Sequence, residues 1–322
     1  MIRIATATAV VLTLAATTFA ASAQDWPNRP VRIVSAFAAG GAADIVARTV
    51  ADHLSNVFKQ QFIVEARPGA SGTLAVQSVV SAPPDGYNFV VTTSTLLVLL
   101  PASKPKLGYD PVKSLTNIAY IAGTPIVLSV SGKSSVKTLK DFIAEAKSSA
   151  KPLTYSSSGL GSSGHLVAEV LAQQAGIKIE HVPYKGGSQG LTDLIGGHIG
   201  FGAQTLPSTA QHMKSGTLSA IAHSAKDRVA EFPQVPTLKE EGYDIVSTTW
   251  YSLSGPAGLP DDIVQKLNRA VAEGMKTPEA QQRLKQNGLI DEAMSVAAFR
   301  TFIDSETARW KPVVEQAGLV EK

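Results

Sequence analysis

The sequence predicts an α/β protein made of two lobes. Short apolar, β-branched segments alternate with segments whose apolar residues recur at helical spacing, and this alternation begins at Val31 and resumes from Ile118. A chain of 322 residues suits two domains of ordinary size. We therefore expect largely parallel β-structure with helices covering both faces.

The first unit contains three predicted strands joined by glycine-rich loops and helices. The strands are Val31–Val34, Phe62–Glu65 and Asn88–Thr93, and the last runs out into Ser94 and Thr95. After the first strand, the loop from Phe37 to Asp44 leads into apolar residues at helical spacing from Val46 to Val57. A shorter helix is predicted at Thr73–Val80, after the loop Arg67-Pro68-Gly69-Ala70-Ser71-Gly72.

The second unit and the C-terminal third follow the same alternation. Predicted strands are Ile118–Ala122, Ile126–Val130, Ile179–Val182, Ile199–Ala203, Leu218–Ser224 and Ile245–Leu253. Predicted helices are Leu139–Lys147 with Thr138 as its cap, Leu191–Ile195, a segment around Ser208–Lys214, Asp262–Lys276, Pro278–Gln286 and Val296–Gln316. Three terminal helices with one strand cannot form an independent sheet, so we expect them to pack on the first lobe.

This organisation predicts that the chain passes twice between the lobes. We place the crossings near Thr124–Val127 and Val246–Trp250, where they form a hinge. Lobe 1 then comprises residues 24–125 and 247–322, and lobe 2 comprises residues 126–246.

The central segment Thr154–Leu166 is the strongest candidate for a binding site. Small, hydroxylated and glycine residues join a strand to the start of a helix whose apolar pattern begins at Leu166. A helix N-terminus carries unpaired N–H groups and a partial positive charge. No Lys or Arg lies between Pro152 and Gly176. We therefore expect an anion held by dipoles and by hydroxyls of Ser156–Ser158, Ser162 and Ser163.

Residues 1–23 resemble a secretory signal peptide. One basic residue, Arg3, precedes an apolar run from Ile4 to Ala20, and an Ala-x-Ala pattern ends at Ala23, where we predict cleavage. The alternative is a membrane anchor, but the run is short, rich in Ala and Thr, and no basic cluster follows it.

Composition excludes several classes of function. The chain has no cysteine, which rules out disulfides, thiolate metal sites and cysteine nucleophiles. The 29 basic and 26 acidic residues are nearly balanced, and no basic run exceeds two residues, so a nucleic-acid partner is not expected. The six histidines show no metal-ligand spacing, so we predict no metal and no cofactor.

Several residues in these loops have more than one interpretation. Gly159-Leu160-Gly161-Ser162-Ser163-Gly164 fits a dinucleotide-binding motif, a tight turn, or an anion site. His165 either contacts a ligand or caps the loop, and Asp44 either faces the ligand or only favours the helix dipole. Tyr184 is either a core ring or, as its loop setting favours, a pocket wall.

The motifs together resemble the Bug receptors, the periplasmic solute receptors of tripartite tricarboxylate transporters. The matching segments follow the family's order over essentially the whole predicted mature chain. They are Phe37-x-x-Gly40-Gly41-x-x-Asp44, Glu65-x-Arg67-Pro68-Gly69-Ala70-x-Gly72, Pro84-Asp85-Gly86-Tyr87, Tyr109-Asp110-Pro111, Tyr155-Ser156-x-x-Gly159-x-Gly161-Ser162 with His165-Leu166, Pro183-Tyr184-Lys185-Gly186 and Pro256-Ala257-Gly258.

This resemblance implies a two-lobed, type II-like periplasmic binding protein, a Venus flytrap that closes on a small organic acid. It implies that a carboxylate sits on the central loop of lobe 2 and that the Gly-Gly loop of lobe 1 contacts the other end, often through water. The expected ligand-binding residues are Phe37, Ala39, Gly40, Gly41, Asp44, Thr93, Ser94, Ser156, Ser157, Gly161, Ser162, Ser163, Gly164, His165, Tyr184, Gln204 and Thr205.

The chain departs from the family pattern in two places. Ala38 and Ala39 stand where prolines are usual, and Gln204 stands where an acid is common. The expectation is a monomeric periplasmic receptor, not an enzyme, that binds a small carboxylate, most simply a dicarboxylate, and delivers it transiently to membrane transporter subunits. The alternatives are an exported serine hydrolase and a dinucleotide-binding protein.

Overall fold

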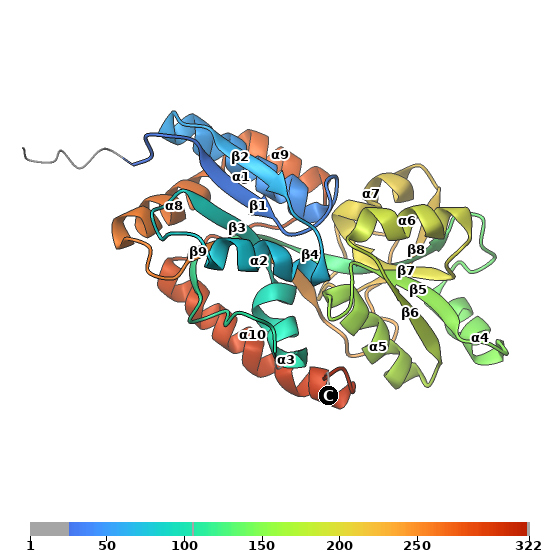
Figure 1. The fold of residues 1–322 in the computed structure, drawn as a ribbon. Helices are drawn as coiled ribbons and strands as arrows, with labels where there is room; N and C mark the ends of the chain where they lie inside the picture. Colours follow the sequence, from blue (N-terminus) through green and yellow to red (C-terminus); the bar gives the residue numbers. More distant parts are fainter. Residues whose placement is uncertain (1–25, 105, 321–322) are drawn as a thin grey trace, which may run out of the picture.

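The computed structural model describes residues 26–104 and 106–320, which form one nine-stranded mixed sheet with helices on both faces (Figure 1). The strands are β1 (Val31–Ser35), β2 (Phe62–Ala66), β3 (Asn88–Thr93), β4 (Leu115–Ser131), β5 (Leu153–Ser157), β6 (Ile179–Pro183), β7 (Phe201–Thr205), β8 (Leu218–His223) and β9 (Thr248–Pro256). The predicted signal peptide and its cleavage site lie outside the described residues.

Ten α-helices and two short turns complete the described chain. They are α1 (Ala42–Phe58), η1 (Ala70–Gly72), α2 (Thr73–Val80), η2 (Thr95–Leu99), α3 (Leu100–Ser103), α4 (Leu139–Ser148), α5 (Ser163–Ala175), α6 (Gly187–Gly196), α7 (Leu206–Lys214), α8 (Asp261–Gly274), α9 (Pro278–Gln286) and α10 (Val296–Gln316). No helix among them is long and apolar enough to cross a membrane.

Strand β4 joins two halves of the sheet. Its residues Leu115–Pro125 pair with β9, and its residues Ile126–Ser131 pair with β7 and β8. On one side the order continues from β9 through β3 and β1 to β2, and on the other from β7 through β5 to β6. Figure 1 shows these two halves side by side with β4 running between them. We call the half with β1, β2, β3 and β9 the first half, and the half with β5–β8 the second half.

The prediction of largely parallel pairing is wrong. Parallel pairs occur among β1, β2 and β3 and among β5, β6 and β7, but every pair that involves β4 or β9 is antiparallel. The two strands predicted at Ile118–Ala122 and Ile126–Val130 are one strand of 17 residues. Pro125 lies inside this strand but stands where β4 changes partners, so its missing N–H interrupts little of the ladder.

Other differences concern boundaries and one missed segment. Strand β7 begins two residues after its predicted start, and β9 begins three residues after its own. Helix α6 begins at Gly187, before the predicted start at Leu191, because the glycines of its first turn hid the helical pattern. The segment Thr95–Ser103 was not predicted as helical. Its leucines and Val98 are buried all round, so they show no amphipathic period. The cap of α4 by Thr138 is confirmed as a full capping box.

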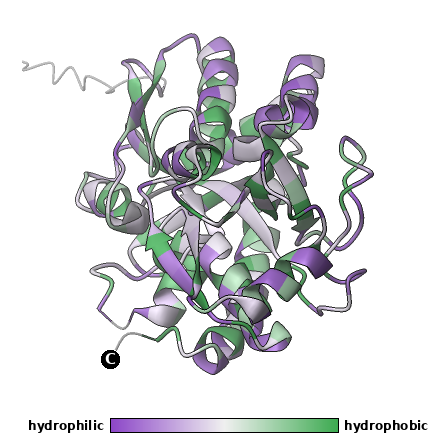
Figure 2. Cartoon of the chain, turned by 90° about the vertical axis from the view of Figure 1, so that its right-hand side faces the viewer, coloured by the Kyte–Doolittle hydropathy of each residue, from purple (hydrophilic) through white to green (hydrophobic). Residues whose placement is uncertain are grey.

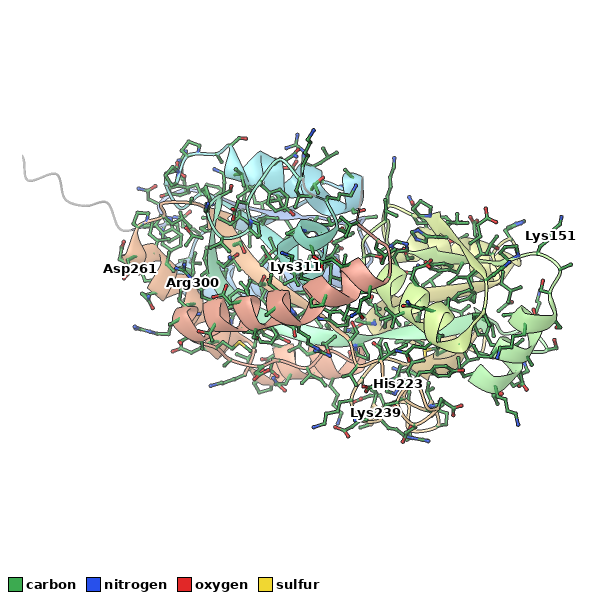
Figure 3. All side chains as sticks on the ribbon, turned by 90° about the horizontal axis from the view of Figure 1, so that it is seen from below. Lys151, His223, Lys239, Asp261, Arg300 and Lys311 are labelled. Carbon is green, nitrogen blue, oxygen red and sulfur yellow. The ribbon has the colours of Figure 1, made fainter. Side chains whose placement is uncertain are left out.

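Each half has its own apolar core. In the first half α1 and α8 cover one face of the sheet, while α2, α3 and α10 cover the other; α8 packs on α1 and β4, and α10 packs on β4 and α3. In the second half α4 and α5 enclose a separate core. Figure 2 shows the hydrophobic residues gathered on the sheet and inner helix faces. Figure 3 shows Lys151, Lys239, Asp261, Arg300 and Lys311, all exposed, around the outside.

Candidate ligand-binding site

A cavity of about 40 Å³ lies between the two halves. This space has room for about three ordered water molecules. The lining residues come from both halves, including β9 of the first, and from β4. They are Phe37, Ala38, Gly41, Ala42, Ala43, Thr93, Thr95, Ile126, Ser158, Ser162, Ser163, Gly164, Gly186, Gly187, Thr205, Ser208, Thr249 and Tyr251.

Four helix N-termini point at this cavity. The N-cap residues of α1, α5, α6 and α7 all line it, and they are Gly41, Ser162, Gly186 and Thr205. The N-terminus of α1 faces the cavity from the first half, and the other three face it from the second. Each carries a partial positive charge and unpaired N–H groups. None of the lining residues is Lys or Arg, so helix dipoles dominate the local field.

Two buried hydroxyls in the wall lack a hydrogen-bond partner. The Oγ1 atoms of Thr93 and Thr249 make no hydrogen bond, although these residues are only 1% and 5% exposed. Buried polar groups are normally paired, and leaving one unpaired costs roughly 1–3 kcal/mol. Both residues line the cavity, so a polar ligand there can satisfy them.

A third hydroxyl, that of Tyr251, lies at the same wall. Burial raises its pKa well above the usual value for tyrosine, and the hydrogen bond with Thr205 acts in the opposite direction with less effect. The phenol therefore stays protonated at neutral pH and can donate to an anion.

The central loop, residues 158–162, is held from below by its own side chains. Ser162 caps α5, because its Oγ accepts a hydrogen bond from the His165 N–H at 3.2 Å. The same Oγ donates to the Oγ of Ser157, which also accepts from the Gly159 N–H at 3.1 Å. The Ser158 hydroxyl donates to the side-chain oxygen of Gln204 at 3.1 Å. These contacts shape the loop before any ligand arrives.

A pair of stacked histidines supports the loop. The Nδ1 atom of His165 accepts a hydrogen bond from the Gly161 N–H at 3.0 Å. The His165 ring stacks on the His181 ring, with 4.1 Å between the ring centroids. Burial, with a smaller contribution from His181, lowers the pKa of His165 to about 3, and burial lowers the pKa of His181 to about 4. Both rings are therefore neutral at pH 7, as the acceptor role of Nδ1 requires.

The loop of the first half is held more simply. The Gly40 N–H donates to the Oδ2 atom of Asp44 at 3.1 Å, and Arg48 pairs with the same oxygen at 3.0 Å. The N-cap residue Gly41 offers no side chain to its helix, so the first-turn N–H groups of α1 have no side-chain cap. The Asp44 N–H donates to the Gly41 carbonyl, which leaves the N–H groups of Ala42 and Ala43, two residues of the cavity lining, without a side-chain cap.

The predicted site residues divide into two groups. Those that line the cavity are Phe37, Gly41, Thr93, Ser162, Ser163, Gly164 and Thr205; those outside the lining are Ala39, Gly40, Asp44, Ser94, Ser156, Ser157, Gly161, His165, Tyr184 and Gln204. The structure places His165 under the loop as a cap. The hydroxyl of Tyr184 donates to Asp193 on α6, and the ring lies outside the lining of this cavity.

Sequence reasoning missed part of the wall. The pair Gly186-Gly187 precedes a helix as Gly40-Gly41 does, and that parallel was the available signal. Thr249 and Tyr251 alternate with Thr248 and Trp250 along β9, so a period of two marks them as one face of the strand. Ile126 carried no signal, because only the course of β4 brings it to the cavity.

The geometry does not favour catalysis. The closest pair of nucleophile and base near the site is Ser157 Oγ with His181 Nε2 at 2.6 Å, but Ser157 is fully buried and outside the cavity lining. Across residues 26–104 and 106–320, no three His, Asp or Glu side chains are grouped as metal ligands.

Comparisons with known proteins agree with this geometry. Residues 46–319 match the family described as the tripartite tricarboxylate transporter family receptor, TctC. The R. palustris protein Rpa4515, solved with adipate, is 32% identical with a TM-score of 0.88, covering 91% of this chain and 99% of that one. The periplasmic binding protein BugD is 28% identical with a TM-score of 0.88, and the match covers 92% of this chain and 100% of BugD. MatC from Rhodopseudomonas palustris, solved with bound malate, is 28% identical with a TM-score of 0.85, and the match covers 90% of this chain and 100% of MatC.

Proposed function

Because this chain belongs to the family of tripartite tricarboxylate transporter receptors, we propose that its cavity binds a small dicarboxylate. The family consists of solute receptors, so the protein is a binding protein and not a hydrolase or a dinucleotide enzyme. The predicted family and the two-lobed periplasmic-binding-protein fold are confirmed.

One observation carries the proposal. Four helix N-termini from two halves of the molecule converge on one cavity whose lining contains no cationic side chain. Two negative ends of one ligand match this arrangement, because α1 faces the cavity from the first half and the other three helices from the second. One carboxylate then lies at the central loop and the other near Gly41. The unpaired hydroxyls of Thr93 and Thr249 add donors.

The structural relatives support the same ligand class. Adipate and malate, the compounds in two of the related structures, are both dicarboxylates. They differ in length and in the hydroxyl of malate. The hydroxyls of the wall suit a hydroxylated ligand such as malate.

The remaining expectations become part of the proposal. We propose that the signal peptide is removed after Ala23 and that the protein acts as a monomer in the periplasm. Residues 24–125 with 247–322, and residues 126–246, then move as two lobes about Thr124–Val127 and Val246–Trp250. The closed receptor passes its ligand to membrane transporter subunits.

A thermal-shift screen followed by calorimetry tests the function. Purified protein is heated with monocarboxylates, dicarboxylates including adipate and malate, aromatic acids, and NAD. We expect dicarboxylates to raise the melting temperature most and to be recovered unchanged. If only NAD or only monocarboxylates stabilise the protein, or if an acid is consumed, the proposal is wrong.

Solution scattering tests the motion. A ligand shared by two lobes favours the closed arrangement, so a bound dicarboxylate should lower the radius of gyration. An unchanged radius at saturation contradicts the hinge.

A further inference from the structure

A strained loop of the first half reaches across to the central loop. Residues 69–72 all have positive φ: Gly69 at 139°, Ala70 at 48°, Ser71 at 54° and Gly72 at 93°. Glycine accepts such values readily, but a side chain with a Cβ does not. Strain of this kind persists only where the surroundings impose it.

The first half fixes the conformation of this loop. The Gly72 N–H donates to the Gly69 carbonyl at 2.9 Å, and the Thr73 hydroxyl donates to the Ala70 carbonyl at 2.9 Å. A Cβ at Gly72 would lie 3.1 Å from Ala36, so the backbone there is pressed against the first-half core. All of these contacts lie within the first half. The direction of the Ser71 side chain is therefore set before the halves meet.

Ser71 contacts the central loop of the second half. Its Oγ donates to the carbonyl of Leu160 at 2.8 Å, across 89 residues of sequence. A Cβ at Gly159 would lie only 2.9 Å from the Ser71 Oγ, so the approach of Ser71 requires glycine at this position. The Gly159 φ of +128° requires glycine as well. Neither Ser71 nor Leu160 lines the cavity. Ser71 therefore acts on a ligand only through the loop.

We propose that Ser71 is a positioning residue that holds the central loop when the halves close, through its hydrogen bond to the Leu160 carbonyl. We call this hydrogen bond the clasp, and we propose that it sets how long the ligand stays bound. This inference rests on the proposed function. The clasp forms between the halves only on closure, so its loss should raise the dissociation rate. Ligand entry into the open cleft does not require it, so the association rate should change little.

The experiment compares Ser71→Ala with Ser81→Ala. Ser81 is exposed, and its hydroxyl bonds only to the Gln77 carbonyl in its own helix, so it is a matched control. Stopped-flow kinetics with adipate and malate should show dissociation about three- to tenfold faster for Ser71→Ala and unchanged for Ser81→Ala. Ser71→Asn should recover slow dissociation, because asparagine tolerates positive φ and its amide can donate. Equal dissociation rates for Ser71→Ala and wild type overturn the proposal.

A second measurement separates failure of the clasp from failure of the proposed function. If neither acid binds the wild type, the proposed function fails, and closure is measured in the free protein. Because the chain has no cysteine, spin labels can be placed on cysteines introduced at exposed Lys147 and Lys276. Ser71→Ala should reduce the population with the short distance between labels. An unchanged distance distribution then overturns the clasp.

Discussion

The two sides of the cavity use the same local unit in different ways. On each side a strand, a glycine-rich loop and a helix N-terminus face the ligand space, as β1–α1 and as β5–α5. On the second side the loop is bonded internally through Ser157, Ser162 and His165. On the first side α1 has no side-chain cap, and Thr93 has no partner.

This difference gives the two sides different roles: the loop of the second side is preorganised, and the first side recognises the ligand. A loop whose own groups are satisfied has a fixed shape, so it can bind an anion without an ordering cost. A side with unpaired donors gains the most binding free energy from a ligand, because the ligand removes the free-energy cost of buried donors that have no partner. We therefore expect changes in the second loop to affect closure and stability, and changes at Thr93 to affect affinity alone.

The largest effect is expected from Gly161→Val. Gly161 has φ of +71°, and a Cβ there would lie 2.7 Å from Leu100 of the first half. This collision is with a side chain of the opposite half, so we expect the added bulk to oppose closure. Overpacking against the buried Leu100 costs up to about 3 kcal/mol and acts only when the halves are together, which predicts an affinity loss of about a hundredfold by calorimetry.

Gly176→Val is the matched control for that change. Gly176 also has a left-handed φ, +62°, but a Cβ there would meet nothing within 4 Å. It should lower stability through strain and leave affinity nearly unchanged. Equal losses of affinity in the two variants would show that strain, and not the contact between halves, is responsible.

The next effect concerns the unpaired hydroxyls. Thr93→Val preserves shape and removes a hydroxyl that has no partner in the closed empty protein. A hydrogen bond to a charged group contributes about 1.5–3 kcal/mol, so affinity for a dicarboxylate should fall about ten- to a hundredfold. Stability of the free protein should stay equal or rise. Calorimetry and urea denaturation measure the two quantities.

The neighbouring residue provides the opposite pattern. The Thr92 hydroxyl bonds to the hydroxyls of Ser252 and Ser254, so Thr92→Val should cost about 1 kcal/mol of stability and little affinity. If both variants lose stability and neither loses affinity, the first side does not contact the ligand through its hydroxyls.

A smaller effect concerns pH and the histidines under the second loop. Their folded pKa values, about 3 for His165 and about 4 for His181, lie below the ordinary value near 6.5. As the pH falls below 6.5, the unfolded chain takes up protons first, so the free energy of unfolding falls until the folded rings also protonate. The contribution of His165 is roughly 1 kcal/mol per pH unit.

Urea denaturation at several pH values between 7 and 4 measures this effect. The slope should weaken in a His165→Gln/His181→Gln double variant and persist in the control His198→Gln, since His198 is exposed. Tyr155 and Glu169 also face the pair, through the Tyr155 hydroxyl bonded to Glu169 at 2.7 Å. A slope that survives in the double variant points instead to other titrating groups.

The smallest effect is expected at Lys185. This cation follows β6 and is exposed, and it does not line the cavity. If dipoles alone hold the anion, Lys185→Ala should change affinity less than twofold by calorimetry. A large loss would mean that a charge, and not the helix termini, holds the ligand on the second side.

Much of the site was predictable because capping and glycine patterns are local. The strand, loop and helix at Leu153–Ala175 follow from residues within a few positions of one another, and so does the cap at Ser162. The hydroxyls of Ser156 and Ser157 were expected at the ligand, but both residues are fully buried outside the cavity lining. Local pattern indicates that a hydroxyl is near a loop and does not indicate which side of the backbone it occupies.

The sequence by itself determined the alternating α/β units, the two glycine-rich loops and the family, and it predicted an anion at the central segment. These depend on side-chain periodicity and on backbone preferences, which act over a few residues. The tertiary structure alone decided that β4 is one strand through both halves, that α6 and α7 join α1 and α5 at the cavity, and that Thr93 and Thr249 are left unpaired. The physical reason is that a cavity is defined by which distant segments pack together, and that packing depends on long-range burial which no short pattern encodes.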